Sequence, residues 1–148
     1  MADRAQSENY IEIRQVQKES SALAEASIIV AAGRGIKEEE NLELIQQLAS
    51  VFNGAAVGGS RPLCDLHWLE YKQQIGITGA TVTPDLYLAC GISGAAQHIS
   101  GMRNAGFIVS VNIDPKAAIF NHSDVCIVED LNTFIPTFME TVQKMKQA

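Results

Sequence analysis

The sequence predicts an α/β fold built on a parallel sheet, and three features of the chain support it. From Ser27 onward, short apolar runs rich in β-branched residues recur along the chain. Each run closes on Gly, Asn or Asp, and several are followed by apolar residues at helical spacing. The first run is continuously apolar, which is typical of a strand covered on both faces. With 148 residues, the chain has the usual size of one domain.

Five segments are predicted to be strands: 27–32, 55–57, 85–90, 107–112 and 125–128. A helix is expected after the first strand, because apolar residues from Leu42 to Phe52 keep a 3.6-residue spacing. Glu38, Glu39 and Glu40 would place negative charge near its N-terminus, where the helix dipole favours it. A closing amphipathic helix is expected around 135–145. The turn 91–95 is expected to open another helix, with His98 in its first turns.

Two regions lack this pattern. Residues 1–25 are polar and predict a lead segment or linker, with one alternating patch at 10–16 that favours an edge strand, so that 26–148 form the domain proper. Between Leu63 and Pro84 the periodicity fades and Gly and Thr become frequent, which predicts a long loop with little regular structure. Loops of this length are often functional.

Composition excludes several classes of function. Eleven Lys and Arg against seventeen Asp and Glu give a net charge of −6, which disfavours nucleic acid as a partner. The three widely spaced cysteines fit neither a zinc site nor a disulfide set, and favour a reducing cytoplasm. No apolar run reaches the 18 or so residues of a membrane span, so no membrane insertion is expected. Neither a metal site nor a nucleophile with its base is recognisable, and no catalytic residue is predicted.

The candidate site is the carboxyl edge of the sheet. Parallel strands that end in Gly-rich turns place backbone N–H groups and small side chains at one edge, where nucleotides commonly bind. The turn Gly33-Arg34-Gly35 is weak evidence, because it lacks the later Gly of a dinucleotide-binding fingerprint. The turn 91–95 is stronger. The side chains and turns expected at this edge form an anion-binding set: Arg34, Ser60, Arg61, Thr78, Ser93, Gly94, Gln97, His98 and Asn112.

Several motifs, taken in order, carry a resemblance to a known family. They are Gly33–Gly35, Gly58–Arg61, Gln74–Gly79, Pro84–Tyr87 and Gly91–His98, followed by Asn112–Pro115 and Ala118–Phe120. In this order they resemble the FAD-binding C-terminal domain of the electron transfer flavoprotein α subunit, from about Ser27 to the end of the chain. An ordered set of motifs is far more specific than any one of them.

This resemblance implies a Rossmann-like, three-layer parallel sheet of the FAD/NAD-binding type, with FAD as cofactor. It also implies an electron carrier rather than an enzyme, which works with an electron transfer flavoprotein β subunit between a donor dehydrogenase and an acceptor oxidoreductase. Because the family's α subunit carries an N-terminal domain besides, we interpret the chain as an excised FAD domain or a piece of a longer subunit.

The resemblance also implies site residues. The adenosine and phosphate part of FAD would meet Arg34, Ser60, Asn112 and Asp130. The isoalloxazine ring would lie beside Arg61 and the loop Gln74, Ile75, Gly76, Ile77 and Thr78. The pyrophosphate and ribityl part, up to the pyrimidine edge of the flavin, would follow Ser93, Gly94, Ala95, Ala96, Gln97 and His98.

Reduction of a flavin places negative charge near N1 and O2, so Arg61 and a hydrogen bond from His98 would stabilise its reduced forms, and Thr78 would donate to N5. The chain departs from the family at two positions of the flavin loop. Ile77 stands where Gln is common and Ala80 where Lys is common, so a polar contact and a cation are expected to be missing.

Two alternatives remain open at this point. The chain could be a domain of an NAD- or CoA-dependent enzyme with the same nucleotide-binding fold, its catalytic residues coming from a partner. It could also be an interaction module that has lost its cofactor, although the presence of Arg61, Thr78 and His98 argues against this.

Overall fold

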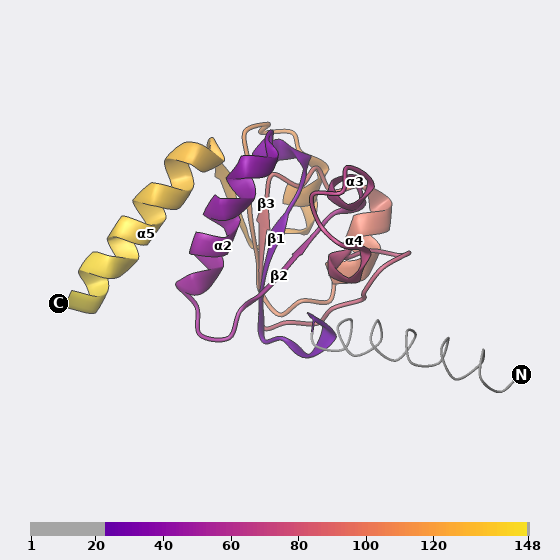
Figure 1. Cartoon of the computed structure of the whole chain (residues 1–148), viewed down its shortest axis with the longest axis horizontal. Coiled ribbons are helices and arrows are strands. Elements are labelled where there is room, and N and C mark those ends of the chain that lie inside the picture. Colours follow the sequence, from indigo (N-terminus) through magenta and orange to yellow (C-terminus); the bar gives the residue numbers. More distant parts are fainter. Residues whose placement is uncertain (1–22, 148) are drawn as a thin grey trace, which may run out of the picture.

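The computed structural model describes residues 23–147 and shows a five-stranded parallel sheet with helices on both faces (Figure 1). The elements in chain order are β1 (Ile28–Ala32), η1 (Arg34–Ile36), η2 (Glu39–Asn41), α2 (Leu42–Ser50), β2 (Ala56–Gly59), α3 (Arg61–Asp65), η3 (Tyr71–Gln73), β3 (Leu86–Cys90), α4 (Ala96–Met102), β4 (Ile108–Asn112), η4 (Ala118–His122), β5 (Val125–Val128) and α5 (Leu131–Gln147), where η denotes a 3₁₀ helix. The predicted α/β class is confirmed.

The strands lie in the order β2-β1-β3-β4-β5. The chain therefore adds β2 on one side of β1 and then crosses to the other side for β3, β4 and β5. In a doubly wound sheet this change of direction leaves a crevice beyond the carboxyl ends of the strands, between β1 and β3 in this order. The topology alone thus points to one edge of the sheet as the place for a ligand.

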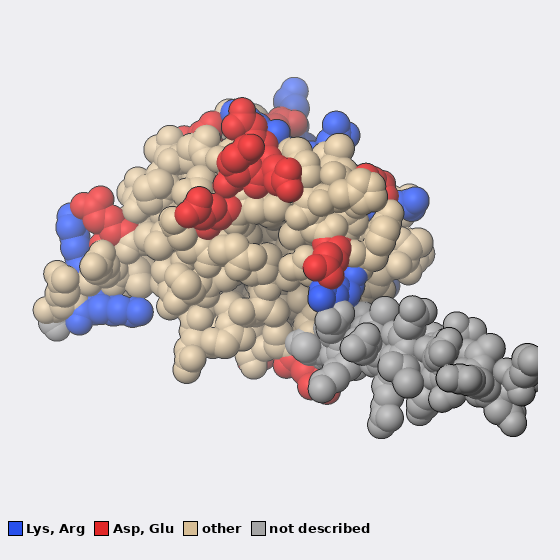
Figure 2. Space-filling view, in the orientation of Figure 1, with Lys and Arg blue, Asp and Glu red and all other residues tan. Residues whose placement is uncertain are grey.

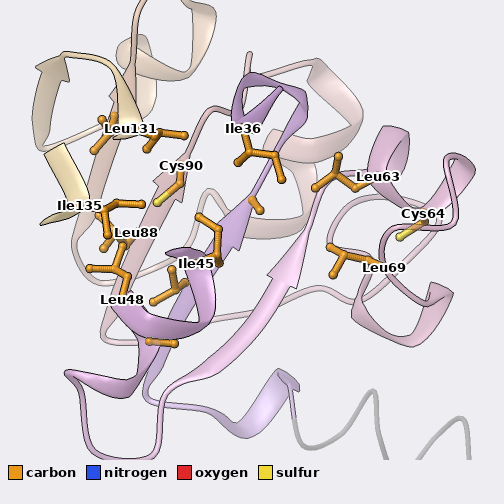
Figure 3. Close-up of a cluster of buried hydrophobic side chains, with 14 residues drawn as sticks. Ile36, Ile45, Leu48, Leu63, Cys64, Leu69, Leu88, Cys90, Leu131 and Ile135 are labelled. Atoms are coloured by element: carbon orange, nitrogen blue, oxygen red, sulfur yellow. The ribbon is translucent and has the colours of Figure 1, made fainter. Parts of the chain in front are cut away.

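Alternate residues of each strand enter two separate cores. On one face, Val30 and Leu88 pack with Ile45 and Leu48 of α2 and with Ile135 of α5 (Figure 3). The opposite face of the same strands packs against α4 and η4, through side chains that include Ile29, Tyr87, Ile99, Met102 and Ile119. The continuous apolar strand β1 is buried on both faces, as its composition predicted.

All five predicted strands are present; β5 has its predicted bounds, and the ends of the other four differ by two residues at most. The predicted first helix is present as α2, which begins at Leu42, and the 3₁₀ turn η2 precedes it. Figure 2 shows acidic side chains gathered over this end of the molecule, where Glu38, Glu39 and Glu40 are exposed just before α2. The edge strand predicted at 10–16 lies outside the described residues, and the domain boundary near residue 26 stays a prediction.

The predicted strand 55–57 left Gly58 and Gly59 to the turn that follows it, but they are the last two residues of β2. A Cβ atom on Gly59 would collide with the Leu69 side chain and lie 2.8 Å from the Ala32 carbonyl oxygen. Beyond this strand the chain returns, and Gln74 pairs with Gly59 in an isolated parallel bridge. Glycine is needed here for close packing, so the composition suggested a turn where the backbone is extended.

The long loop predicted between Leu63 and Pro84 is partly regular. It contains most of α3, the short η3, and a bridge between Ile75 and Ala80. Hydrogen bonds from Ile77 N–H to the Gln97 carbonyl (2.9 Å) and from Val82 N–H to the Gly101 carbonyl (2.8 Å) fasten its second half to α4. Within residues 23–147, no helix combines the length and apolar character needed to cross a bilayer.

The position of α5 on the sheet gives a test of the fold. Ile135 is fully buried between α5 and the sheet, whereas Met145 on the same helix is 71% exposed. We expect Ile135→Ala to lower the free energy of unfolding by about 2–5 kcal/mol, since it leaves a cavity in the core. The control Met145→Ala should change it by less than about 0.5 kcal/mol. Urea unfolding followed by circular dichroism measures both, and equal effects would show that α5 does not pack as described.

Candidate functional site

A cleft of about 620 Å³ opens at the carboxyl edge of the sheet. Its lining comes from the segments that follow β1, β2, β3 and β4, together with the loop 74–78. The lining residues are Arg34, Gly35, Ser60, Arg61, Pro62, Gln74, Ile75, Gly76, Ile77, Thr78, Gly91, Ile92, Ser93, Gly94, Ala95, Gln97, His98 and Asn112. A more open groove between α2 and α5 contains none of the predicted residues.

The turns after β1 and β3 cross in direct backbone contact beneath this cleft. Gly33 N–H donates to the Cys90 carbonyl (2.9 Å) and Gly35 N–H to the Gly91 carbonyl (2.8 Å), so the sheet pairing continues past the strand ends. A Cβ atom on Gly35 would lie 2.6 Å from the Gly91 Cα atom. The two glycine turns therefore leave the sheet at the same level, and the cleft opens above them.

Two predicted cations lie at the cleft. Arg61, the first residue of α3, forms an ion pair with Asp65 one turn later (3.6 Å), and its side chain is 64% exposed. Arg34 follows β1 and is also exposed. Both guanidinium groups can reach an anion in the cleft, but water screens them strongly. Ser60, just before α3, is buried and completes this side of the lining.

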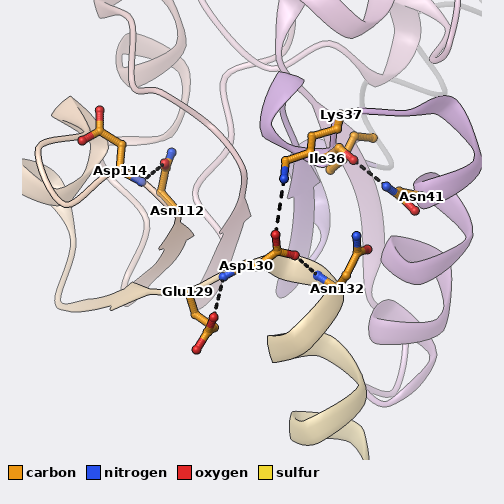
Figure 4. Close-up of polar contacts among 8 residues, drawn as sticks. All are labelled: Ile36, Lys37, Asn41, Asn112, Asp114, Glu129, Asp130 and Asn132. Atoms are coloured by element: carbon orange, nitrogen blue, oxygen red, sulfur yellow. Dashed lines mark hydrogen bonds and ion pairs between the residues drawn. The ribbon is translucent and has the colours of Figure 1, made fainter.

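Asn112 ends β4 and ties that strand to the neighbouring turn. Its Nδ2 donates to the Ile92 carbonyl (3.0 Å), and its Oδ1 accepts a hydrogen bond from Asp114 N–H (2.9 Å), which Figure 4 shows. Both ends of the amide are thus used by the protein backbone. This role in shaping the cleft was not foreseen, and the predicted contact with adenosine stays a prediction.

Asp130 does not line the cleft. It follows β5 and caps α5, where its Oδ1 accepts from Asn132 N–H (2.8 Å), and its Oδ2 pairs with Lys37 Nζ (3.3 Å; Figure 4). These two hydrogen bonds lower the pKa of the Asp130 carboxyl. Ala96 also lies outside the lining, as the first residue of α4. All the other residues predicted to bind the cofactor are brought together.

A buried amide holds the hydroxyl group of Thr78. Gln74 is 4% exposed, and its Nε2 donates to Thr78 Oγ1 over 2.7 Å. Because the hydroxyl oxygen accepts this bond, its own proton is left to donate elsewhere. Ile77, between Gln74 and Thr78 in the sequence, lines the cleft and is 65% exposed. The loop therefore offers one hydroxyl donor and an apolar side chain where the resembled family commonly has glutamine.

His98 carries a buried nitrogen without a partner. The residue is 5% exposed, and its Nε2 lies 2.7 Å from the Tyr87 hydroxyl oxygen. Its Nδ1 has no hydrogen-bond partner in the part of the chain that the structure describes. Burial lowers the pKa of His98 to about 4, although a hydrogen bond with the Ile75 backbone, too poorly aligned to count as a partner for Nδ1, acts in the opposite direction. The imidazole is therefore neutral at physiological pH.

Some residues of the cleft lining were not predicted. Gly35, Pro62, Gly91 and Ile92 line the cleft beside predicted residues. All four lie inside or next to the turns already singled out, so adjacency in the sequence was the available signal. Tyr87 was missed for a different reason: it supports His98 from a strand and does not itself line the cleft.

A cleft at the switch point of a doubly wound parallel sheet, with glycine turns as its floor and arginines at its rim, defines a nucleotide-binding α/β domain. The family model for the electron transfer flavoprotein FAD-binding domain matches residues 22–103. The chain belongs to this family, and its cofactor is FAD. The predicted resemblance is thereby confirmed for the domain, and its place at the C-terminus of a subunit stays a prediction.

Whole subunits from distant organisms are similar to the chain. The electron transfer flavoprotein subunit alpha of Bacillus subtilis is 52% identical over 123 residues, which cover 83% of this chain and 38% of that protein. The mitochondrial subunit alpha of Dictyostelium discoideum is 42% identical over 130 residues, covering 88% and 36%. Subunit LctC of the lactate dehydrogenase (NAD(+),ferredoxin) of Acetobacterium woodii is 41% identical over 135 residues, covering 90% and 32%. The chain thus spans less than two fifths of the length of these relatives.

The buried imidazole makes stability depend on pH. The pKa of His98 falls from 6.5 to about 4 on folding, so between these values the unfolded chain binds the extra proton. Stability should therefore be fully present above pH 6.5 and fall as the pH drops toward 4, by up to about 3 kcal/mol. His98→Gln should remove this part of the pH dependence, while His122→Gln at an exposed position should keep it. Urea unfolding between pH 4 and 8 checks this, and parallel profiles for both variants would contradict it.

Proposed function

We propose that this chain is the FAD-carrying part of an electron transfer flavoprotein α subunit. In this role it works with a β subunit, receives electrons from a donor dehydrogenase and passes them to an acceptor oxidoreductase. FAD, when bound, supplies the redox chemistry, since it accepts and releases electrons singly or in pairs. The observation that supports this best is the buried His98 Nδ1, which has no well-formed hydrogen bond within residues 23–147, at a cleft that also holds two arginines and the Thr78 hydroxyl.

The residues present fit the two halves of the cofactor. We place the adenosine and phosphate part near Arg34, Ser60 and Asn112, and the flavin beside Arg61 and the loop 74–78. The segment 93–98 would run along the middle. Asp130 already accepts two hydrogen bonds, but a carboxylate has about four acceptor positions, so it keeps capacity for a sugar hydroxyl.

The hydrogen-bond donors at the flavin end would stabilise the negative charge of a reduced flavin, and they would not make or break covalent bonds. A positive guanidinium and neutral N–H and O–H donors stabilise negative charge that builds up when electrons arrive. Thr78 and His98 make this contribution without a proton transfer. Electrons can then be taken up without any acid, base or nucleophile, in agreement with the sequence, where no such set was recognised.

The rival reading as an NAD- or CoA-dependent enzyme domain is less favoured, because the family match is to an FAD-binding domain. One relative is nevertheless named as a subunit of a lactate dehydrogenase. In an assembly of that kind we expect this domain to remain the electron relay, with substrate chemistry in a partner. The described cysteines Cys64, Cys90 and Cys126 are free, which agrees with our proposal of a reducing, cytoplasmic setting.

A calorimetric titration with FAD, FMN, NAD and coenzyme A tests this function. We expect FAD to bind most tightly, because both halves of the cleft then have a partner. Arg34→Ala should weaken the binding of FAD by about 1 kcal/mol or less, as is usual for an exposed charge. The binding of FMN should be nearly unchanged. Equal affinities for FAD and FMN would contradict the proposed contacts with adenosine. Tighter binding of NAD or coenzyme A would favour the alternative hypothesis of an NAD- or CoA-dependent enzyme domain.

Arg61 should tune the potential of the bound flavin. Removing a cation beside a group that gains negative charge destabilises the reduced state, so Arg61→Ala should lower the potential. The side chain is largely exposed and paired with Asp65, so we expect about 1 kcal/mol, roughly 40 mV for one electron. Asp65→Asn frees the guanidinium from its partner and should shift the potential upward instead. Spectroelectrochemical titration measures both, and shifts of the same sign would place Arg61 away from the flavin.

A further inference from the structure

We propose that Tyr87 is a positioning residue that holds His98 as the tautomer with its proton on Nδ1, so that His98 faces the cleft as a hydrogen-bond donor. The proposal rests on the function given above for the cleft. It extends that function to a residue outside the cleft lining. It also specifies the partner that His98 can bind, which is a hydrogen-bond acceptor such as a carbonyl oxygen and not an N–H group.

The two side chains come from different layers. Tyr87 lies on β3 and is fully buried, and His98 is the third residue of α4, which packs on that face of the sheet. Their rings are 6.1 Å apart between centroids, tilted by 55°, with the hydroxyl oxygen 2.7 Å from Nε2. This geometry is that of a short O–H···N or N–H···O hydrogen bond.

The count of protons distinguishes the two neutral tautomers. If Nε2 carried the proton, it would donate to the Tyr87 oxygen, and the phenol proton would need another acceptor. Within residues 23–147, the Tyr87 hydroxyl forms its hydrogen bond with His98 and with no other residue. That arrangement leaves two buried groups unsatisfied, the phenol O–H and the Nδ1 lone pair.

With the proton on Nδ1 instead, Tyr87 donates to the Nε2 lone pair and is satisfied. The one remaining group is Nδ1–H, a buried group of a residue in the cleft lining, which has no well-aligned hydrogen bond within residues 23–147. The Ile75 backbone, in the same lining, raises the pKa of the imidazole through a hydrogen bond that is too poorly aligned to satisfy this group. A buried donor without a protein partner is costly unless a ligand or water accepts from it. The arrangement with fewer unsatisfied groups is thus also the one that presents a donor to the cofactor.

Burial supports the neutral state on which this choice depends. Because the pKa of His98 is lowered, the ring is neutral at physiological pH and carries one N–H proton, on either Nδ1 or Nε2. A charged imidazole would donate from both nitrogens, and Tyr87 would then have no influence on which one faces the cleft. In the neutral ring, one hydrogen bond from the strand determines the character of the opposite nitrogen.

The test compares Tyr87→Phe with the same substitution at exposed Tyr71. Nitrogen NMR of the cofactor-free chain, labelled with ¹⁵N-histidine, reports the tautomer of His98 directly. We expect the wild type and Tyr71→Phe to carry the proton on Nδ1. In Tyr87→Phe, the ratio of the Nδ1–H to the Nε2–H form should fall by about fivefold or more, the value of one net hydrogen bond.

Calorimetry then measures the affinity for FAD, and we expect Tyr87→Phe, but not Tyr71→Phe, to weaken it by about threefold to tenfold. A wild-type His98 protonated on Nε2 would overturn the proposal, and this measurement needs no variant to fold. An unchanged tautomer ratio in Tyr87→Phe would also overturn it, as would a changed ratio with unchanged affinity. If the tautomer results are as expected but no variant or wild type binds FAD, the proposed function fails while the control of His98 by Tyr87 stands.

Discussion

The contact between the turns after β1 and β3 is the constraint on which the cleft depends. Two backbone hydrogen bonds continue the pairing of these strands beyond their ends, and glycines allow the turns to touch. A side chain on Gly35 would push the turns apart, because the opposing atoms belong to backbone. Main-chain contacts therefore fix the floor of the cleft, and the positions of the residues that line the cleft depend on them.

Side chains at the cleft are held by buried neighbours rather than by one another. Gln74 orients Thr78 from within the loop that pairs with β2, and Tyr87 meets His98 from the central part of the sheet. In each pair, a buried polar side chain supports a residue that lines the cleft. Such support reduces the ordering that binding has to bring about, since the donors are already in place.

Much of this could be predicted from the sequence because the signals were local. The continuous apolar run at β1 and the small residues of the turn 91–95 each indicate structure within a few neighbouring residues. Gly59 was misread because close packing and turning favour the same residue. Asp130 was placed at the cofactor by resemblance. An Asp just before an amphipathic helix is a common N-cap residue, so its role in capping α5 had a local signal, whereas Lys37 lies 93 residues away and its pairing with Asp130 had none. The Tyr87–His98 pair spans a strand and a helix, so no periodicity indicates it.

The unusual acidity of the buried imidazole has a consequence for the energetics of the cleft. A histidine at its ordinary pKa would gain and lose a proton close to neutrality, and electron uptake next to it would then vary with the proton concentration of the surroundings. His98 stays uncharged well below neutrality. Under the proposed function, the hydrogen bond that it offers stays the same across the physiological range, and this residue adds no dependence on cellular pH to the driving force for electron uptake.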